Sequence, residues 1–209
     1  MKPYEKVAVF GGTFSPVHNG HIKAMEAYAK TVRPDILYII PTAIPPHKIR
    51  KDSATDAQRL KMLNMVAEEL DVPCKVFVSD MEILRGGISY TCDTVFLLRK
   101  IYKEVCIFCG TDMLLTLDEW RNAWLFLKHI SVAYMQREED FRYNREVEEK
   151  IPYLMKNFGA KFIKIPEEPI EISSSEIRCR VQRGEDISDI VPPKVAEFIR
   201  KEGLYTSGK

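Results

Sequence analysis

The sequence predicts an α/β fold, in which a Rossmann-like, doubly wound and mostly parallel sheet carries helices on both faces. Short apolar runs of strand length alternate with longer amphipathic stretches, which is the pattern of repeated strand–helix units. Glycine or proline directly follows several of the apolar runs. The length of 209 residues suits one well-buried domain, because a chain of this size buries a large core. We therefore expect residues 1–209 to form a single domain.

In the first half of the chain, the two kinds of segment alternate strictly. Runs of four or five mostly apolar residues predict strands, and the second run ends at Pro41, which cannot continue a strand ladder. Apolar side chains three or four positions apart predict helices, as at Leu60 and Leu63. The expected elements are strand Val7–Phe10, helix His21–Lys30, strand Ile36–Ile40, helix Asp56–Glu69, strand Lys75–Ser79 and helix Thr91–Lys100.

The second half continues the pattern with longer connections. Mixed charge is dense from Arg137 to Lys150, which indicates a solvated loop running into a helix face. No internal repeat or low-complexity linker interrupts the chain. The expected elements are strand Val105–Cys109, strand Ile130–Tyr134, helix Val147–Phe158, strand Lys161–Ile165, helix Ser174–Arg183 and helix Pro193–Glu202.

Three turns follow strands of this predicted sheet and are expected at one edge of it. They are the Gly11–Gly12 turn, the Pro41–Lys48 loop and the Gly110–Asp112 turn. Ligands of open α/β sheets bind outside the carboxyl ends of the strands. The sequence therefore places a ligand site where these three turns meet.

Composition excludes some partners and leaves others open. The formal net charge is +1, so no global field attracts the chain to nucleic acid or to an anionic membrane. No apolar segment approaches the roughly 20 residues that a membrane span needs, and the N-terminus has no signal-peptide pattern. We expect a cytoplasmic protein with small-molecule partners, and the sequence leaves a homo-oligomer open.

The cysteines are expected to be reduced and structural. Their number, five, is odd and they are scattered along the chain, which is typical of free thiols. Cys106 and Cys109 form a C-x-x-C inside an apolar run, where a buried strand is favoured over a redox pair or a metal site. No protein-built metal site is expected.

Residues 11–21 hold the most informative pattern, in which two histidines follow a glycine turn where a helix should begin. Glycine lets the backbone approach a ligand closely, and a helix start offers free N–H groups to an anion. His18 and His21 would add two imidazoles to that geometry. A lone histidine is usually a surface residue or a satisfied core residue, but this context favours a phosphate site. Neither a P-loop nor a G-x-G-x-x-G motif is present.

Four further residues or groups are candidates for a functional role, a structural role, or both. Lys48 follows the stiff pair Pro45-Pro46 and suits a triphosphate, or it is an exposed lysine. Ser173–Ser175 precede Arg178 and could grip phosphates, cap a helix, or do both. Trp120 lies among polar residues and could stack on a flat ring. Trp124 is expected to pack inside the protein.

The glycine–histidine segment resembles the signature of the H-x-G-H nucleotidyltransferases, and more narrowly that of the bacterial nicotinate mononucleotide adenylyltransferases. Ser15 departs from the aspartate usual there, although a serine hydroxyl can also cap a loop. Arg137 departs as well, because the family's R-R-P is replaced by Q-R-E. The segments that resemble the family's motifs are 11–21 (GGTFSPVHNGH), 40–48 (IPTAIPPHK), 89–94 (SYTCDT), 110–112 with Leu117 and Trp120, 172–178 (ISSSEIR) and 203–205 (GLY).

The resemblance implies transfer of the adenylyl group of ATP to nicotinate mononucleotide, which yields deamido-NAD and pyrophosphate. Mg²⁺ would ride mainly on the triphosphate, and helical residues 173–205 would complete the ATP site. The alternatives are the same chemistry on nicotinamide mononucleotide or phosphopantetheine, and a non-catalytic nucleotide-sensing module. The implied residues are His18, His21, Lys48 and Arg178 in catalysis, Gly11, Gly12, Thr13, Phe14, Gly110, Asp112, Ile172, Ser173 and Ser174 at ATP, and Tyr90, Thr91 and Trp120 at the mononucleotide.

Overall fold

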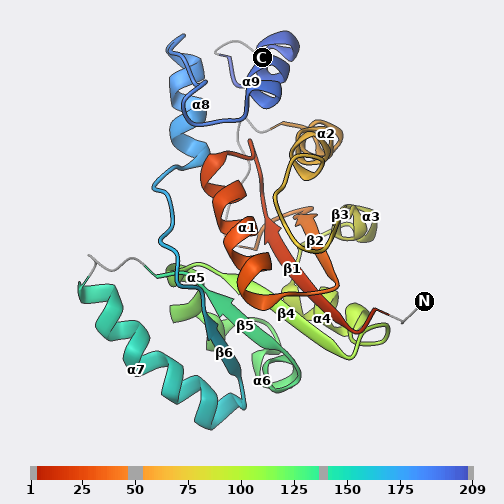
Figure 1. Ribbon diagram of the computed structural model, residues 1–209, viewed down its shortest axis with the longest axis vertical. Coiled ribbons are helices and arrows are strands. Elements are labelled where there is room, and N and C mark those ends of the chain that lie inside the picture. The colour runs from red at the N-terminus through yellow and green to blue at the C-terminus, as the bar shows by residue number, and fades with distance from the viewer. Residues whose placement is uncertain (1–3, 47–53, 137–140, 207–209) are drawn as a thin grey trace.

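Six strands form one sheet in the order β3-β2-β1-β4-β5-β6, and each neighbouring pair is parallel (Figure 1). The computed structural model describes residues 4–46, 54–136 and 141–206. All six predicted strands are confirmed. Their bounds are β1 Lys6–Gly12, β2 Ile36–Pro41, β3 Lys75–Val78, β4 Glu104–Cys109, β5 Ser131–Tyr134 and β6 Lys161–Lys164.

The six predicted helices are present, and further short ones lie between them. Helix α7 begins at Phe141, earlier than predicted, so part of the mixed-charge stretch that was expected to be a loop is helical. The bounds are α1 Asn19–Val32, α2 Asp56–Ala67, α3 Met81–Arg85, α4 Thr91–Leu98, α5 Thr111–Leu115, α6 Ala123–Phe126, α7 Phe141–Phe158, α8 Ser174–Gln182 and α9 Pro193–Glu202, with 3₁₀ turns η1 Leu117–Glu119 and η2 Leu127–His129.

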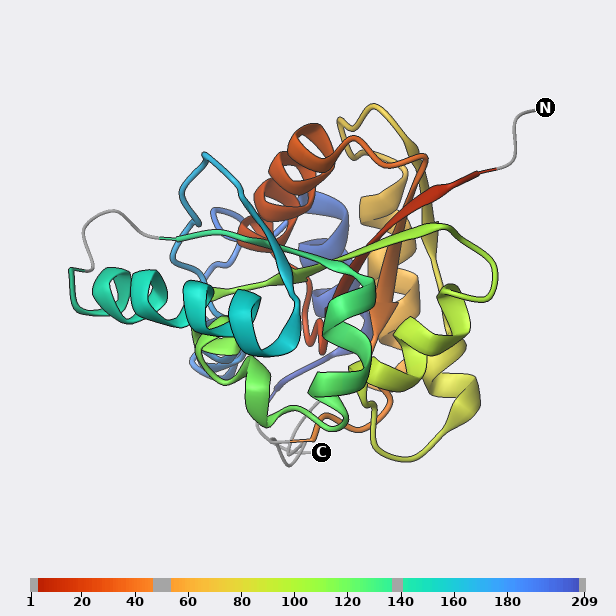
Figure 2. The same ribbon diagram turned by 90° about the horizontal axis from the view of Figure 1, so that it is seen from below.

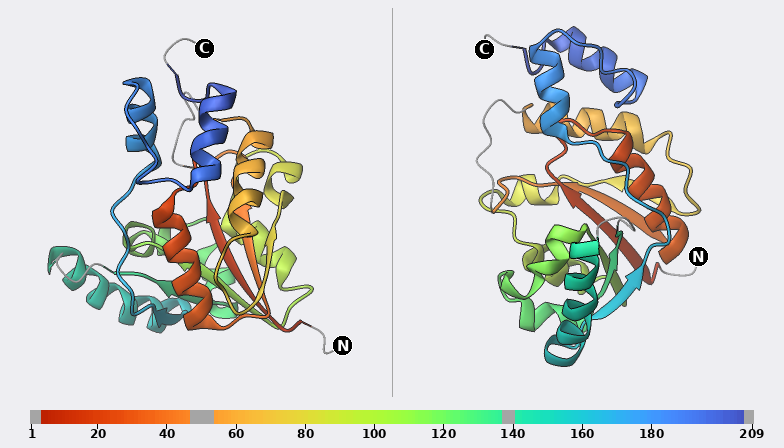
Figure 3. Two further views of the ribbon diagram at one scale, coloured as in Figure 1. Left: turned by 45° about the horizontal axis from the view of Figure 1, so that its top comes forward. Right: turned by 90° about the vertical axis from the view of Figure 1, so that its left-hand side faces the viewer.

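Helices flank both faces of the sheet (Figures 2 and 3), and a hydrophobic core covers each face. Successive strand side chains point to opposite faces, so Ala8 and Phe10 of β1 face one core whereas Val7 and Val9 face the other. Helices α1, α2 and α9 bury apolar side chains in the first core. Helices α4, α5, α6 and α7 do so in the second. The doubly wound fold predicted from the sequence is confirmed.

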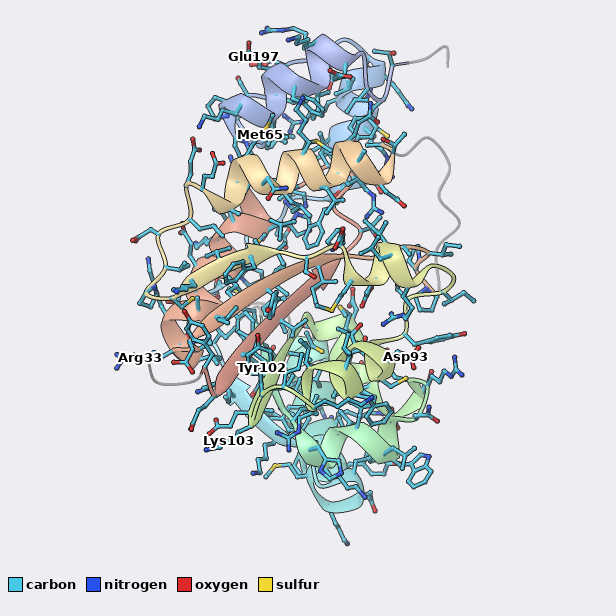
Figure 4. The ribbon with its side chains drawn as sticks, turned by 90° about the vertical axis from the view of Figure 1, so that its right-hand side faces the viewer. Arg33, Met65, Asp93, Tyr102, Lys103 and Glu197 are labelled. Atoms are coloured by element: carbon cyan, nitrogen blue, oxygen red, sulfur yellow. The ribbon has the colours of Figure 1, made fainter. Side chains whose placement is uncertain are left out.

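Different elements lie at the two ends of the sheet. Helices α8 and α9 lie at one end, and α9 lies beside α2 (Figure 1). There the Nζ of Lys61 sits 4.8 Å from the Phe198 ring centroid. Figure 4 shows Met65 on α2 at this contact. It shows Lys103 at the opposite end, beside the start of β1. The Lys103 Nζ lies 2.7 Å from the Glu5 carboxylate. Across the described ranges, none of the helices combines the length and apolar character that crossing a membrane requires.

The strand order changes direction between β1 and β4. Strands β2 and β3 follow β1 to one side, and β4, β5 and β6 extend to the other. In such sheets the ligand crevice lies outside the carboxyl ends of the strands at this switch point. Gly11 and Gly12 end β1, paired with Ile40 and Pro41, so the predicted glycine turn is corrected to a strand end. The chain reverses after it, where Phe14 has a φ of 51°.

Candidate active site

The two histidines of the sequence motif lie together at the start of α1, beyond the carboxyl end of β1. His18 is the N-cap residue, and its Nδ1 accepts a hydrogen bond from the His21 backbone N–H at 3.3 Å. The two ring centroids are 3.6 Å apart, with 30° between the ring planes. An N-cap side chain bonds the N–H three residues on, so the H-x-G-H spacing itself brings the rings together.

Close packing holds this pair in place. A Cβ added at Gly20 would lie 3.1 Å from the His18 Nδ1 and 3.1 Å from the Ile170 carbonyl oxygen. No larger residue fits between the histidines without displacing the first ring. The Phe14 ring contacts His21 edge-on at a centroid distance of 5.1 Å. The intervening glycine therefore avoids a tight contact with the His18 ring.

Both imidazoles are neutral at neutral pH. Burial lowers the pKa of His18 to about 4, and it lowers the pKa of His21 as well, with a smaller contribution from the neighbouring His18. Because the His18 Nδ1 accepts an N–H, hydrogen-bond logic assigns the ring proton of neutral His18 to Nε2. The buried Nδ1 of His21 has no hydrogen-bond partner within the described residues. The pair can therefore offer ring N–H groups to an anion.

The low pKa of His18 makes folding stability pH-dependent. A histidine with a folded-state pKa of about 4 against an ordinary 6.5 favours the native state above pH 6.5, and this stability is lost as the pH falls towards 4. We expect wild type to lose about 3 kcal/mol more than His18→Asn over that interval, since asparagine keeps the N-cap acceptor. Urea unfolding of both proteins at several pH values measures the difference. Parallel curves would contradict the expected ionisation of His18.

The loop between β1 and α1 brings main-chain atoms close to the histidine pair. The Phe14 side chain is buried, with 1% exposed, so only its main chain can reach a ligand. A Cβ at Gly12 would lie 2.9 Å from the Phe14 ring, whereas a Cβ at Gly11 meets nothing within 4 Å. Glycine at position 12 is thus needed for packing, and Gly11 borders open space beside the strand end.

The start of α8 contacts this loop, as the predicted role of the C-terminal part requires. The Ser174 hydroxyl donates to the Pro16 carbonyl at 2.8 Å. The Arg178 Nη1 donates to the Ser15 carbonyl at 2.7 Å and its Nη2 to the Ser175 hydroxyl at 3.1 Å. Ser173 caps α8 by accepting the Glu176 N–H at 3.1 Å, which confirms the predicted capping. Ile172, just before the cap, packs half-buried against the first core.

Ser15 stands where the resembled family usually has aspartate, and its hydrogen bonds still hold the loop in place. Its hydroxyl accepts the Ala54 N–H at 3.2 Å and lies 3.1 Å from the Tyr205 hydroxyl. The carbonyl of the same residue accepts from Arg178. Tyr205 belongs to the C-terminal G-L-Y of the sequence, so the end of the described chain reaches back to the loop before the histidines.

Two predicted regions lie on helices that pack against the other face of the sheet from α1. Gly110 is the N-cap residue of α5, and Asp112 is exposed in the first turn of that helix, directly after β4. Tyr90 and Thr91 begin α4 without a side-chain cap, which confirms the predicted helix start. The Arg121 guanidinium lies 4.5 Å from the Tyr90 ring centroid. These residues follow β3 and β4, whereas the histidines follow β1.

Trp120 and Trp124 have opposite environments, which corrects one prediction. Trp120 is half-buried against the second core. The turn before it is anchored by an ion pair of 2.7 Å between Lys150 and Asp118. Trp124 is 63% exposed, although the sequence predicts that it packs inside. The helix that carries it, α6, spans only Ala123–Phe126, and its buried residues are Ala123 and Phe126.

Three further predictions remain, and two of them fall on residues that the structure does not describe. Lys48 and Arg137 lie outside the described residues, so their roles stay predictions. Cys106 and Cys109 are buried in β4, which confirms the predicted strand. Burial raises the pKa of Cys106 to about 11 and that of Cys109 further, so both thiols stay protonated at neutral pH.

Sequence reasoning missed Arg59, a charged residue on the inward face of α2. It shares that face with Met62, Leu63 and Val66, and none of its surface is exposed. Its Nη1 donates to the Thr13 carbonyl at 2.8 Å. The sequence did hold a signal for this residue. A charged residue at a core-facing position of a helix is buried only where it has partners.

The family described as cytidylyltransferase-like matches residues 9–180. A Clostridium acetobutylicum protein named "Probable nicotinate-nucleotide adenylyltransferase" is 35% identical, covering 96% of this chain and 99% of its own length. The chain belongs to the nicotinate-nucleotide adenylyltransferase family. A relative of the same name from Neisseria meningitidis serogroup B is 33% identical, with coverages of 96% and 98%. The resemblance stated from the sequence motifs is therefore confirmed.

Solved structures agree with this adenylyltransferase fold. The nicotinic acid mononucleotide adenylyltransferase of Plasmodium falciparum complexed with NaAD superposes with a TM-score of 0.75 and covers 97% of this chain and 98% of its own. The same protein complexed with APC gives a TM-score of 0.71. Identity to both is 17%, so this likeness concerns the fold alone.

Proposed function

We propose that this adenylyltransferase joins ATP and nicotinate mononucleotide into nicotinate adenine dinucleotide, with release of pyrophosphate. One observation of the structure supports it most strongly. The rings of His18 and His21 lie 3.6 Å apart at a helix start, beyond the carboxyl end of the strand beside the switch point. Family membership supports the substrates, because the relatives at 33% and 35% identity carry the name of this activity.

The reaction needs positioning rather than a protein nucleophile. A phosphate oxygen of the mononucleotide attacks the α-phosphorus of ATP in line and forms the new P–O bond. The bond from that phosphorus to the bridging oxygen of the β-phosphate breaks, and pyrophosphate leaves with the electron pair. Negative charge therefore grows on the departing oxygens, and fixed hydrogen-bond donors accelerate the step. The ring N–H groups of His18 and His21 are the proposed donors.

The leaving pyrophosphate is proposed to lie between the histidines and α8. Arg178 uses two of its nitrogens on Ser15 and Ser175, and a guanidinium has five N–H donors, so others can reach the β- and γ-phosphates. Ser173 and Ser174 hold the helix start beside it. Lys48, outside the described residues, is proposed to bring a further positive charge.

The two nucleoside ends are proposed to occupy the edge next to β4. Asp112, exposed after β4, would contact the adenosine part together with the Gly110 and Ile172 main chain. Tyr90 and Thr91 would read the pyridine carboxylate, supported by the helix start that carries no side-chain cap and by the positive dipole end of a helix. Trp120 would stack on the pyridine ring.

A tryptophan pair tests the stacking proposal. We expect Trp120→Ala to raise the KM for nicotinate mononucleotide about 3- to 10-fold, the size of one aromatic stacking contact, and to leave the KM for ATP nearly unchanged. Trp124→Ala is the matched control, because Trp124 is 63% exposed four residues away. Steady-state kinetics with each substrate varied in turn measure both constants. Equal increases for the two substrates would contradict the assignment.

The acceptor is tested by measuring pyrophosphate release from ATP with three acceptors in parallel. We expect the highest kcat/KM with nicotinate mononucleotide, because a carboxylate gains charge-assisted hydrogen bonds that an amide does not. Faster reaction with nicotinamide mononucleotide or phosphopantetheine would replace the proposed substrate. ATP binding without turnover on any acceptor would indicate the nucleotide-sensing module instead.

Mg²⁺ is proposed to enter with ATP, held mainly by the triphosphate. Among the described residues, no three histidine, cysteine or acidic side chains are grouped closely enough to hold a metal ion. The described donor set near the histidines is instead cationic or neutral, which suits phosphate oxygens. A bound Mg²⁺ would neutralise charge on the triphosphate. The cytoplasmic location and a homo-oligomeric state stay predictions.

A further inference from the structure

Arg59 joins two loops that leave the sheet at neighbouring strands. Its Nη1 donates to the Thr13 carbonyl at 2.8 Å, after β1, and its Nη2 donates to the Thr42 carbonyl at 2.7 Å, after β2. The Nη2 also lies 2.6 Å from the Asp56 carboxylate. The Thr42 N–H in turn donates to the Gly12 carbonyl at 2.9 Å. One buried guanidinium therefore fixes the main chain of both loops.

Stability alone does not account for an arginine here. The side chain of Arg59 is 0% exposed and that of its ionic partner Asp56 is 43% exposed. Removing a charge from water is costly, and a buried ion pair is often no more stabilising than apolar side chains of similar volume. The inward face of α2 otherwise carries apolar residues, so an apolar residue would suit this position. What only arginine provides is a planar fork that orients two carbonyl groups.

Holding the Thr13 carbonyl also sets the direction of the next N–H group. In a trans peptide the C=O and the following N–H point in opposite directions, so the Phe14 N–H points away from Arg59. No hydrogen bond from the Phe14 N–H is formed within the described part of the chain. Phe14 has a φ of 51°, and main-chain turns through this region form concave sites for anions.

We propose that Arg59 is a positioning residue for adenylyl transfer. It turns the Thr13 and Thr42 carbonyl oxygens away from the phosphates and leaves the Phe14 N–H facing them. The Phe14 ring contacts His21 at 5.1 Å, so the same residue joins the backbone donor to the histidine pair. Arg59 itself touches no substrate. The inference rests on the proposed function, because it requires phosphates at this loop.

Arg59→Lys tests the role of the fork, because lysine keeps the charge but cannot hold two carbonyls in fixed directions. We expect kcat to fall about 10- to 100-fold, the cost of a misplaced reacting group, in protein that circular dichroism shows to be folded. Asp56→Asn is the matched control: it removes the ionic partner and keeps both carbonyl contacts, so kcat should change less than about threefold, as for a partly exposed ion pair. A folded Arg59→Lys with wild-type kcat, or an equal loss in Asp56→Asn, would overturn the proposal.

If Arg59→Lys does not fold, a measurement on the wild-type enzyme tests whether the Phe14 N–H faces the phosphates. The backbone amide of Phe14 is followed by NMR while a non-hydrolysable ATP analogue and then nicotinate mononucleotide are added. We expect a downfield proton shift at Phe14 and a smaller one at Ala43, whose N–H is already bonded to the Ser89 hydroxyl at 2.8 Å. Shifts of the histidine rings without one at Phe14 would overturn the proposal. Wild-type enzyme that forms no dinucleotide would instead refute the proposed function.

Discussion

His21→Ala should lower kcat about 10²–10⁴-fold, which is the range for removing a donor that acts on charge developing in the transition state. The His21 ring lies 3.6 Å from the His18 ring, and its Nδ1 has no hydrogen-bond partner within the described residues. A phosphate beside it would meet an imidazole held by packing, so little reorganisation is needed during the reaction. The KM values should change much less than kcat, because the strongest contact forms as pyrophosphate departs.

Rapid-quench measurement of a single turnover separates this effect from product release. His129→Ala is the matched control, because His129 is exposed and lies just before the amino end of β5, away from the carboxyl ends of the strands. It should retain wild-type kcat. A His21→Ala enzyme with near-normal single-turnover rate would remove the histidine pair from the mechanism.

The sheet was predictable because its strands are short apolar runs with clear boundaries. Helices α5 and α6 were not predicted, since they hold five and four residues. A segment of about one turn is too short for a period of 3.6 residues to repeat. The wrong prediction for Trp124 has the same cause, because the helix that carries it was not predicted. Without α6, the sequence could not indicate which side of the segment faces water.

The histidine pair was predictable because its geometry is local. The N-cap at position 18 and the N–H at position 21 are three residues apart, and the cap joins them directly. The contacts that surround the pair are long-range: Ser15 meets Tyr205 across 190 positions, and Arg59 meets Thr13 across 46. No periodic pattern encodes such pairs. Sequence reasoning therefore placed the two histidines together and missed Arg59, whose contacts with the loop are long-range.

Arg178→Ala should lower kcat/KM for ATP about 10²–10³-fold, because it removes a charge proposed to stabilise the leaving group. The substitution would also remove a hydrogen bond within the protein. The Ser15 carbonyl would lose its donor at 2.7 Å, in the loop that leads to His18. Arg178→Lys should recover only part of the activity, since lysine cannot hold that carbonyl and a phosphate with one planar fork.

Arg180→Ala is the control that isolates this role. Arg180 lies on the same helix and pairs with Glu176 at 2.9 Å and Asp189 at 3.1 Å. Its removal deletes a positive charge of the same kind together with two surface ion pairs, which contribute little to stability. We expect its kinetics to stay within about twofold of wild type, because such a small loss of stability leaves the protein folded. Equal losses in both variants would mean that α8 supports ATP only through its general charge, and the specific contact of Arg178 with pyrophosphate would be wrong.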